Sequence, residues 1–147
     1  MQRWNGGGDV GSHTRDAGET AVLPRSVLAA GRARVFVDEN LCAEHARSAL
    51  SAATLAASEM GTEAVLTGDG PITLRLTCQE TTVTLSVTFP TDGAEHDERL
   101  RLVDDVAARI IEGISRASGN DVADGRRRIW CTIPTGYLPV PASSARR

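Results

Sequence analysis

The middle of the chain contains two segments in which apolar and polar residues alternate. Apolar side chains occupy every second position of residues 72–78 and again of residues 83–89, with Thr, Ser and Arg between them. This spacing is typical of half-buried strands, because successive side chains of a strand point to opposite faces of the sheet. Gly70 and Pro71 mark the entry to the first strand, and Pro90 ends the second, since proline cannot donate to a central ladder. The two segments are therefore predicted as strands joined by a short turn.

Helical spacing characterises three other segments. Between Val103 and Ile114 the apolar residues fall on one face of a helix, which is the clearest helical pattern in the chain. The Ala-rich run from Ser48 to Val65 also predicts a helix, because alanine has the highest helix propensity. A looser periodicity predicts a further helix between Ser26 and Cys42.

The C-terminal part is predicted as a loop followed by one more strand. Residues 115–125 collect Ser, Gly, Asn and Asp, whereas apolar residues alternate from Ile129 to Ile133 and stop before Pro134. The predicted order is helix, helix, strand, strand, helix, strand. Elements with one apolar side bury that side in a mostly antiparallel sheet with helices on one face. The predicted fold class is α+β, a two-layer α/β sandwich.

Both ends of the chain are predicted to lie outside this unit. Residues 1–25 contain few large apolar side chains, so burial cannot offset the entropy of ordering them, and residues 136–147 are rich in turn formers. We expect flexible tails around one domain, residues 26–135. No apolar run reaches the length of a membrane span, and the first residues lack the apolar core of a signal peptide. The expectation is a cytoplasmic protein without membrane contact.

The composition excludes several kinds of chemistry. A formal net charge of -3 gives no general attraction to nucleic acid or to anionic lipid. Lysine is absent, which excludes a phosphate-loop lysine and a lysine Schiff base. The cysteines are odd in number and lack a C-x-x-C spacing, so they are predicted to be reduced, mostly packed thiols; they are Cys42, Cys78 and Cys131. The histidines are too scattered to indicate a metal site.

One segment resembles a known family of regulatory kinases. The sequence SEMGTEAVLTGDGPITLRL, residues 58–76, resembles the nucleotide-motif helix and following strand of the anti-sigma-factor serine kinases of the GHKL ATPase class. Those proteins carry a Ser-Glu-x-x-Thr-Asn-Ala-like helix and then a His-Gly-like turn. The matching positions are Ser58, Glu59, Thr62, Ala64 and Gly68. ARVFVDENL upstream, and TVTLSVTF, RLVDDVA and RRRIWCTIP downstream, follow in the family's order, so the resemblance covers about residues 33–134 and implies a GHKL ATPase-like fold.

The positions that hold ATP in that family are replaced here. The family's helix asparagine, which helps to hold Mg²⁺, aligns with Glu63, and a second carboxylate would repel an anionic triphosphate. The family's adenine-reading aspartate aligns with Phe89, which cannot accept a hydrogen bond. A shifted register would bring Asp92 and Gly93 into use, but only by extending the strand through Pro90.

The phosphate-binding turn of the family is also altered. Its glycines let backbone amides approach the phosphates, whereas residues 96–100 contain no glycine and include Asp97 and Glu98. Metal, base and phosphate positions are thus all changed. We expect no cofactor, and ATP with Mg²⁺ only if the chain is nevertheless a kinase.

The catalytic and cation-binding roles that the resemblance implies fall on one helix. Glu59 aligns with the general base that activates a serine hydroxyl of the partner. The alternative interpretation is that Glu59, on an Ala-rich helix, is a helix former that faces solvent. Glu63 follows four residues later on the same helical face, so the two carboxylates are interpreted either as an acidic pair or weak cation site, or as two solvated acids.

Candidate partner-binding residues gather at the last predicted strand. Arg126, Arg127 and Arg128 form a basic run that either meets an acidic surface or a phosphate, or is simply solvated. Alternation places Trp130 on the face opposite the helices. There it is either a partner anchor or packs against a tail or a neighbouring strand.

Three functional hypotheses follow. The first is a degenerate, non-catalytic binding module, for which the resemblance implies a sigma factor or a STAS-domain antagonist as partner. The second is an active ATP-dependent serine kinase acting on such an antagonist, with Glu59 as base and Glu63 as metal ligand. The third is a structural domain that forms a homodimer through the uncovered face of the sheet.

Overall fold

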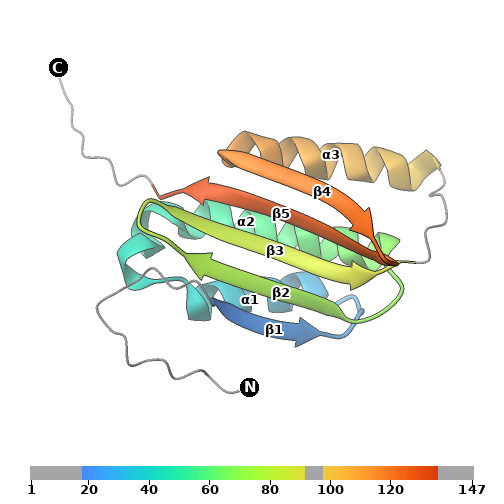
Figure 1. Cartoon of the computed structure of the whole chain (residues 1–147), viewed down its shortest axis with the longest axis horizontal. Coiled ribbons are helices and arrows are strands. Elements are labelled where there is room, and N and C mark those ends of the chain that lie inside the picture. The colour runs from blue at the N-terminus through green and yellow to red at the C-terminus, as the bar shows by residue number, and fades with distance from the viewer. Residues whose placement is uncertain (1–17, 92–97, 136–147) are drawn as a thin grey trace.

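A five-stranded antiparallel sheet forms one layer of the protein, and the helices form the other. The structure is a computed structural model that describes residues 18–91 and 98–135. The strand order is β1-β2-β3-β5-β4 (Figure 1). The strands are β1 (Glu19–Leu23), β2 (Ile72–Cys78), β3 (Thr82–Pro90), β4 (Ala117–Ala123) and β5 (Arg126–Pro134). The helices are α1 (Ala29–Asn40), α2 (Ala43–Thr67) and α3 (Glu98–Ile114).

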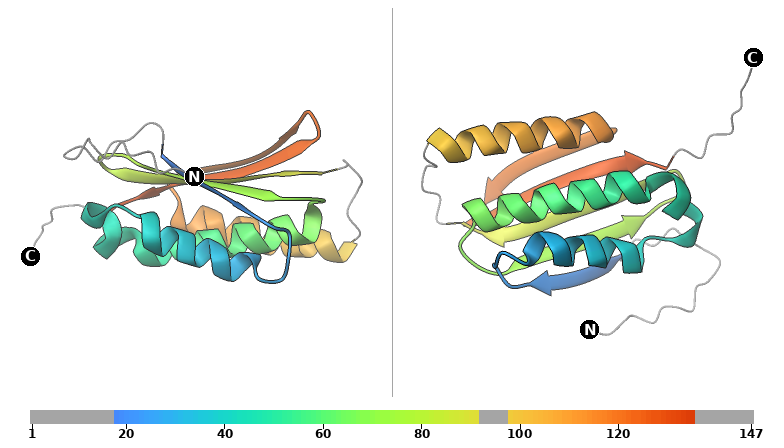
Figure 2. Two further views of the ribbon diagram at one scale, coloured as in Figure 1. Left: turned by 90° about the horizontal axis from the view of Figure 1, so that it is seen from below. Right: turned by 180° about the vertical axis from the view of Figure 1, so that it is seen from behind.

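All of these helices lie on one face of the sheet (Figure 2). The α+β class and the arrangement of helices on a single face are confirmed. None of the described helices has both the length and the apolar character that a bilayer crossing demands.

The predicted strand pair is the centre of the sheet. β2 and β3 pair from Thr73 opposite Thr88 to Cys78 opposite Val83, and β5 lies on the other side of β3. The apolar side chains of these strands face the helices, and several are completely buried; they include Ile72, Leu74, Val83, Leu85, Val87 and Phe89. The period of two in the sequence therefore creates the apolar face that the helices cover.

Small residues let α2 lie close to the sheet and to α1. Among its described residues, the buried apolar side chains are alanines and the larger Met60. A Cβ atom added to Gly61 would lie 3.3 Å from the Cα of Ala30, so the two helices approach too closely there for an easily accommodated side chain. α2 is longer at both ends than the predicted helix from Ser48 to Val65. It begins after Cys42 and ends before Gly68.

The prediction of a flexible tail through residue 25 is wrong for its last part. Residues 19–23 form the edge strand β1, which pairs with β2 from Glu19 opposite Leu76 to Leu23 opposite Ile72. Leu23 is buried and Ala21 packs against the core, so two apolar side chains and the backbone pairing order this segment. Residues 1–17 and 136–147, also predicted as tails, lie outside the described residues.

The prediction of a loop at residues 115–125 is also wrong. This region contains β4, which pairs with β5 along its whole length, from Ala117 opposite Thr132 to Ala123 opposite Arg126. Asp124 and Gly125 have φ angles of 55° and 74° and form the connection between the two strands. Two residues with positive φ match the twist of a tight hairpin, and Asp-Gly is a preferred sequence for it. β4 was missed because it is an edge strand with mostly exposed side chains.

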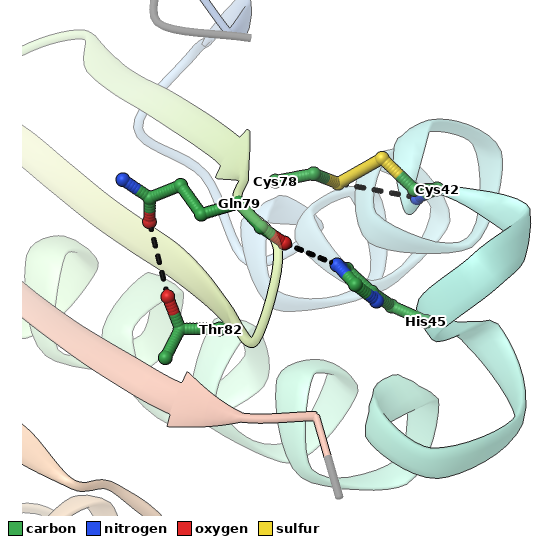
Figure 3. Close-up of a disulfide and its surroundings, with 5 residues drawn as sticks. All are labelled: Cys42, His45, Cys78, Gln79 and Thr82. Atoms are coloured by element: carbon green, nitrogen blue, oxygen red, sulfur yellow. Dashed lines mark hydrogen bonds between the residues drawn. A yellow bond between two sulfur atoms is a disulfide. The ribbon is translucent and has the colours of Figure 1, made fainter. Parts of the chain in front are cut away.

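The cysteines do not all remain thiols, contrary to the prediction. Cys42, at the start of α2, and Cys78, at the end of β2, form a disulfide (Figure 3). His45 lies beside the disulfide, and one of its ring nitrogens hydrogen-bonds the carbonyl oxygen of Gln79. The junction between α1 and α2 is thereby fixed to the turn between β2 and β3. Cys131 is a buried free thiol.

Reduction of the disulfide is expected to destabilise the protein. The bond joins cysteines 36 residues apart. Closing a loop of that size should contribute about 3–4 kcal/mol to the free energy of unfolding, by restricting the unfolded chain. Urea unfolding of a Cys131→Ala variant, with and without dithiothreitol, measures this difference without thiol exchange. A Cys42→Ala/Cys78→Ala/Cys131→Ala control should have the same urea midpoint with and without dithiothreitol. Equal midpoints in the two conditions for the Cys131→Ala variant, which keeps the disulfide, would contradict the prediction.

The buried thiol should make stability depend on pH in the alkaline range. Burial raises the pKa of Cys131 from 9.0 to about 11, although a hydrogen bond with the Ser115 side chain acts in the opposite direction. Because the thiol ionises in the unfolded chain first, stability is fully present below pH 9 and falls as the pH rises towards 11, by about 2–3 kcal/mol. Unfolding free energies between pH 8 and pH 11 check this. A Cys131→Ala variant should lack that part of the decline, and parallel profiles for the two proteins would speak against the prediction.

Candidate functional site

A small cavity opens between α2, α3 and the β4–β5 hairpin. Its volume is about 190 Å³. The lining residues from α3 are Ala107, Ala108, Ile111 and Glu112; those from β4 are Ser118, Gly119 and Asn120; α2 contributes Glu63, and β5 contributes Arg127 and Ile129. One wall of the cavity is thus apolar and the other carries charged and amide groups.

A buried ion pair forms the charged wall. The Arg127 Nη2 atom lies 3.2 Å from Glu63 Oε2, and the two side chains are 10% and 4% exposed. Arg127 also donates from Nη1 to Thr67 Oγ1 and from Nε to Asn120 Oδ1, and each of these hydrogen bonds is 2.9 Å long. The Thr67 hydroxyl in turn donates to the Glu63 carbonyl oxygen. All three guanidinium nitrogens are therefore engaged by α2 and β4.

The position of Arg127 follows from strand alternation. Ile129, Cys131 and Ile133 face the helices, so Arg127, two residues before Ile129, faces them as well. It pairs across the sheet with Phe89, and its guanidinium carbon lies 5.9 Å from the centre of that ring. An aromatic face at this distance attracts a cation. The Phe89 ring thus packs against the Arg127 guanidinium of the ion pair.

The carboxylate of Glu63 is only partly satisfied. Among the described residues, neither of its oxygens has a hydrogen-bond partner, and its charge is balanced only by the nearby Arg127 guanidinium. A buried polar atom without a partner is uncommon in folded proteins. The carboxylate therefore retains unused acceptor capacity beside the cavity.

Of Glu59 and Glu63, only Glu63 lines the cavity. Glu63 is 3% exposed, which excludes its interpretation as a solvated acid. Glu59, one helical turn earlier, is half-buried and does not line the cavity. Across the described part of the chain, no group of three or more His, Cys, Asp or Glu side chains is placed to hold a metal ion.

The position aligned with the adenine-reading aspartate is filled by a packed ring. Phe89 is completely buried, and a Cβ atom added to Gly68 would collide with it. Asp92 and Gly93, the alternative offered by a shifted register, lie outside the described residues. The sequence resemblance puts a phosphate-binding turn at residues 96–100, but residues 98–100 are the first residues of α3 rather than part of a turn.

The arginine run does not form one basic surface. Arg126 and Arg128 are exposed, but Arg127 is buried, because neighbouring residues of a strand point to opposite faces. The expected role of Arg127 in partner binding is therefore corrected to a role in the buried ion pair. The Arg128 guanidinium carbon lies 5.8 Å from the centre of the Trp130 ring on the opposite face.

Trp130 lies on the face away from the helices, as alternation predicts. It is half-buried, and it sits opposite Ser86 of β3 and Gly119 of β4. A side chain on Gly119 would collide with the indole, so Trp130 packs against the neighbouring strand while part of its ring stays exposed. Around it the uncovered face carries many half-buried threonines: Thr73, Thr77, Thr84, Thr88 and Thr132.

Two residues of the site were not predicted from the sequence. Thr67 and Asn120 bind Arg127, but neither lies in a motif. Arg127 itself carried a usable signal, because extending the alternation of Ile129 and Cys131 backwards places it on the buried face.

Removal of one partner of the ion pair should destabilise the protein strongly. Arg127→Met is expected to lower the free energy of unfolding by about 3–5 kcal/mol, because Glu63 is then a buried charge without a counterion. Glu63→Leu/Arg127→Met should recover most of this loss, since apolar residues of similar volume often replace a buried pair without cost. Urea unfolding of the four proteins in a double-mutant cycle gives the coupling free energy.

The matched control for this cycle is Arg126→Met, which removes an exposed arginine from the same strand. It should change stability by no more than about 0.5 kcal/mol. An Arg127→Met protein as stable as the unaltered chain would show that the ion pair does not hold α2 against β5.

No protein-family model matches the chain, and no curated protein matches it in sequence.

Proposed function

We propose that the chain is a regulatory protein-binding domain, a non-catalytic relative of the GHKL-class anti-sigma-factor kinases. Its proposed partner is a sigma factor or a STAS-domain antagonist, as the sequence resemblance implies. The observation that carries the proposal is the buried Glu63–Arg127 ion pair, which occupies the place where that resemblance would put the metal and the nucleotide.

The ion pair is incompatible with the usual metal role of this position. Arg127 already neutralises Glu63, so a Mg²⁺ ion bound there would place two further positive charges beside the buried guanidinium, with one carboxylate to balance all three. Phe89 cannot accept a hydrogen bond from an adenine amino group. Both features argue against conventional nucleotide binding.

The size of the cavity supports the same conclusion. Its 190 Å³ is below the range of about 300–1,000 Å³ that is usual for pockets that bury small-molecule ligands. A nucleoside triphosphate is larger than most such ligands. No nucleotide cofactor is therefore part of the proposal.

The uncovered face of the sheet is the proposed partner surface. Trp130 offers a rigid aromatic group whose ring is partly exposed, and such groups are enriched at the centres of protein interfaces. Exposed Arg126 and Arg128 precede it along β5 on the same face. Their charge suits an acidic partner and would accelerate association.

The proposed setting is the cytoplasm, where such partners act, and this setting bears on the disulfide. Cytosolic thiols are kept reduced by glutathione and thioredoxin. The Cys42–Cys78 bond would therefore form there only if it resists reduction or if it reports oxidising conditions.

Binding measurements on the full chain test the proposal. Calorimetry should detect no binding of ATP at millimolar concentration, with or without Mg²⁺. A purified sigma factor or STAS-domain antagonist should bind saturably, with the same affinity when ATP is present. Trp130→Ala should weaken this binding by at least tenfold, because loss of an aromatic anchor typically costs about 2 kcal/mol or more of binding free energy.

The matched control is Val122→Ala, which shortens an exposed apolar side chain of β4 that lies opposite Arg127, away from the Trp130 face. Its affinity should be unchanged. Micromolar binding of ATP with Mg²⁺, together with phosphorylation of an antagonist serine that Glu59→Ala abolishes, would replace the proposal by the kinase hypothesis.

A further inference from the structure

The cavity beside α3 contains a buried acceptor that no described residue satisfies. The Glu63 side chain is 4% exposed, lines the cavity, and has no hydrogen-bond partner on either carboxylate oxygen within the described residues. The Oε2 atom lies 3.2 Å from Arg127 Nη2. An orphaned buried carboxylate oxygen is costly unless a donor reaches it.

Within the described part of the chain, neither Arg127 nor Thr67 makes a hydrogen bond to the Glu63 carboxylate. Arg127 directs its three nitrogens to Glu63 Oε2, Thr67 and Asn120. The Thr67 hydroxyl donates its only proton to the Glu63 carbonyl oxygen. A donor on a molecule in the cavity would satisfy this carboxylate.

The charges around the cavity favour a cation. Among the described residues, the titratable groups that line it are the carboxylates of Glu63 and Glu112 and the guanidinium of Arg127. Among the described lining residues, two carboxylates stand against one guanidinium that is already paired with Glu63, so an anion would meet net repulsion. An ammonium group supplies both the missing donors and the missing charge.

The size and the opposite wall of the cavity determine the rest of the ligand. Ala107, Ile111 and Ile129 form an apolar surface across from the carboxylate. A volume of 190 Å³ compares with the roughly 150 Å³ apolar cavity that binds benzene in a protein interior. A ligand with a compact apolar body about that size would fill the space.

We propose that this cavity binds a small organic ammonium ion. The ammonium group donates to Glu63 Oε1, with Glu112 nearby at the rim, and the apolar body lies against Ala107, Ile111 and Ile129. This site goes beyond the proposed protein-binding role and does not depend on it, because the partner surface is on the other face of the sheet.

The test uses the full chain and benzylammonium as the probe. Titration followed by ¹H–¹⁵N correlation spectra should give saturable shifts centred on Glu63, Ile111, Asn120 and Ile129. Benzyl alcohol, which keeps the ring but loses the charge, should bind at least tenfold more weakly. Benzoate, the anionic analogue, should not bind. Equal affinities for benzylammonium and benzoate, or no saturable shift with millimolar benzylammonium, would overturn the proposal.

Two variants separate the roles of charge and space. Glu63→Gln should lose at least tenfold in affinity for benzylammonium, but it also leaves Arg127 without its counterion. Ala107→Leu fills the cavity and alters no charge, so it should abolish binding while the protein stays folded. Glu80→Gln, on an exposed turn, is the matched control and should bind as the unaltered chain does. Unchanged binding by folded Ala107→Leu, or by folded Glu63→Gln, would refute the site.

Discussion

The guanidinium of Arg127 is buried on the helix-covered face of the sheet, and this constrains the residues that α2 and β4 place around it. A buried cation must have a counterion and partners for its donors. α2 therefore has to present Glu63 and Thr67 on the same face, one helical turn apart, and β4 has to pair with β5 so that Asn120 reaches Nε. The Phe89 ring packs against the same guanidinium. A single side chain of β5 thus contacts both a central helix and an edge strand.

The ion pair also limits what can bind beside α2. A buried salt bridge adds little stability compared with apolar residues, because desolvation offsets the attraction between the charges. Its effect is to fix geometry: Glu63 is held by Arg127 rather than left available to an incoming metal, and Phe89 is packed against Gly68. Arg127 and Thr67 use polar atoms to hold α2, β4 and β5 together, whereas the Glu63 carboxylate keeps unused acceptor capacity.

The sequence predicts the centre of the fold better than its edges. β2, β3, β5 and α3 carry clear periodicity, because each buries one face and exposes the other. β1 and β4 are edge strands ordered mainly by backbone pairing, which leaves little pattern in their side chains, although Asp124-Gly125 signals the hairpin. The disulfide and the roles of Thr67 and Asn120 depend on distances between segments far apart in the chain, which no local pattern contains.

The cavity and the proposed partner surface meet at β4. Gly119 lines the cavity on one side of the sheet, and on the other side its lack of a side chain makes room for the Trp130 indole. β4 is an edge strand, held along one side only by β5, so it is among the elements of the sheet that move at least cost. A ligand that pushes Gly119 outward would therefore move the support of Trp130 as well. A single strand thickness separates the two surfaces, and this gives the fold a direct physical route for coupling them.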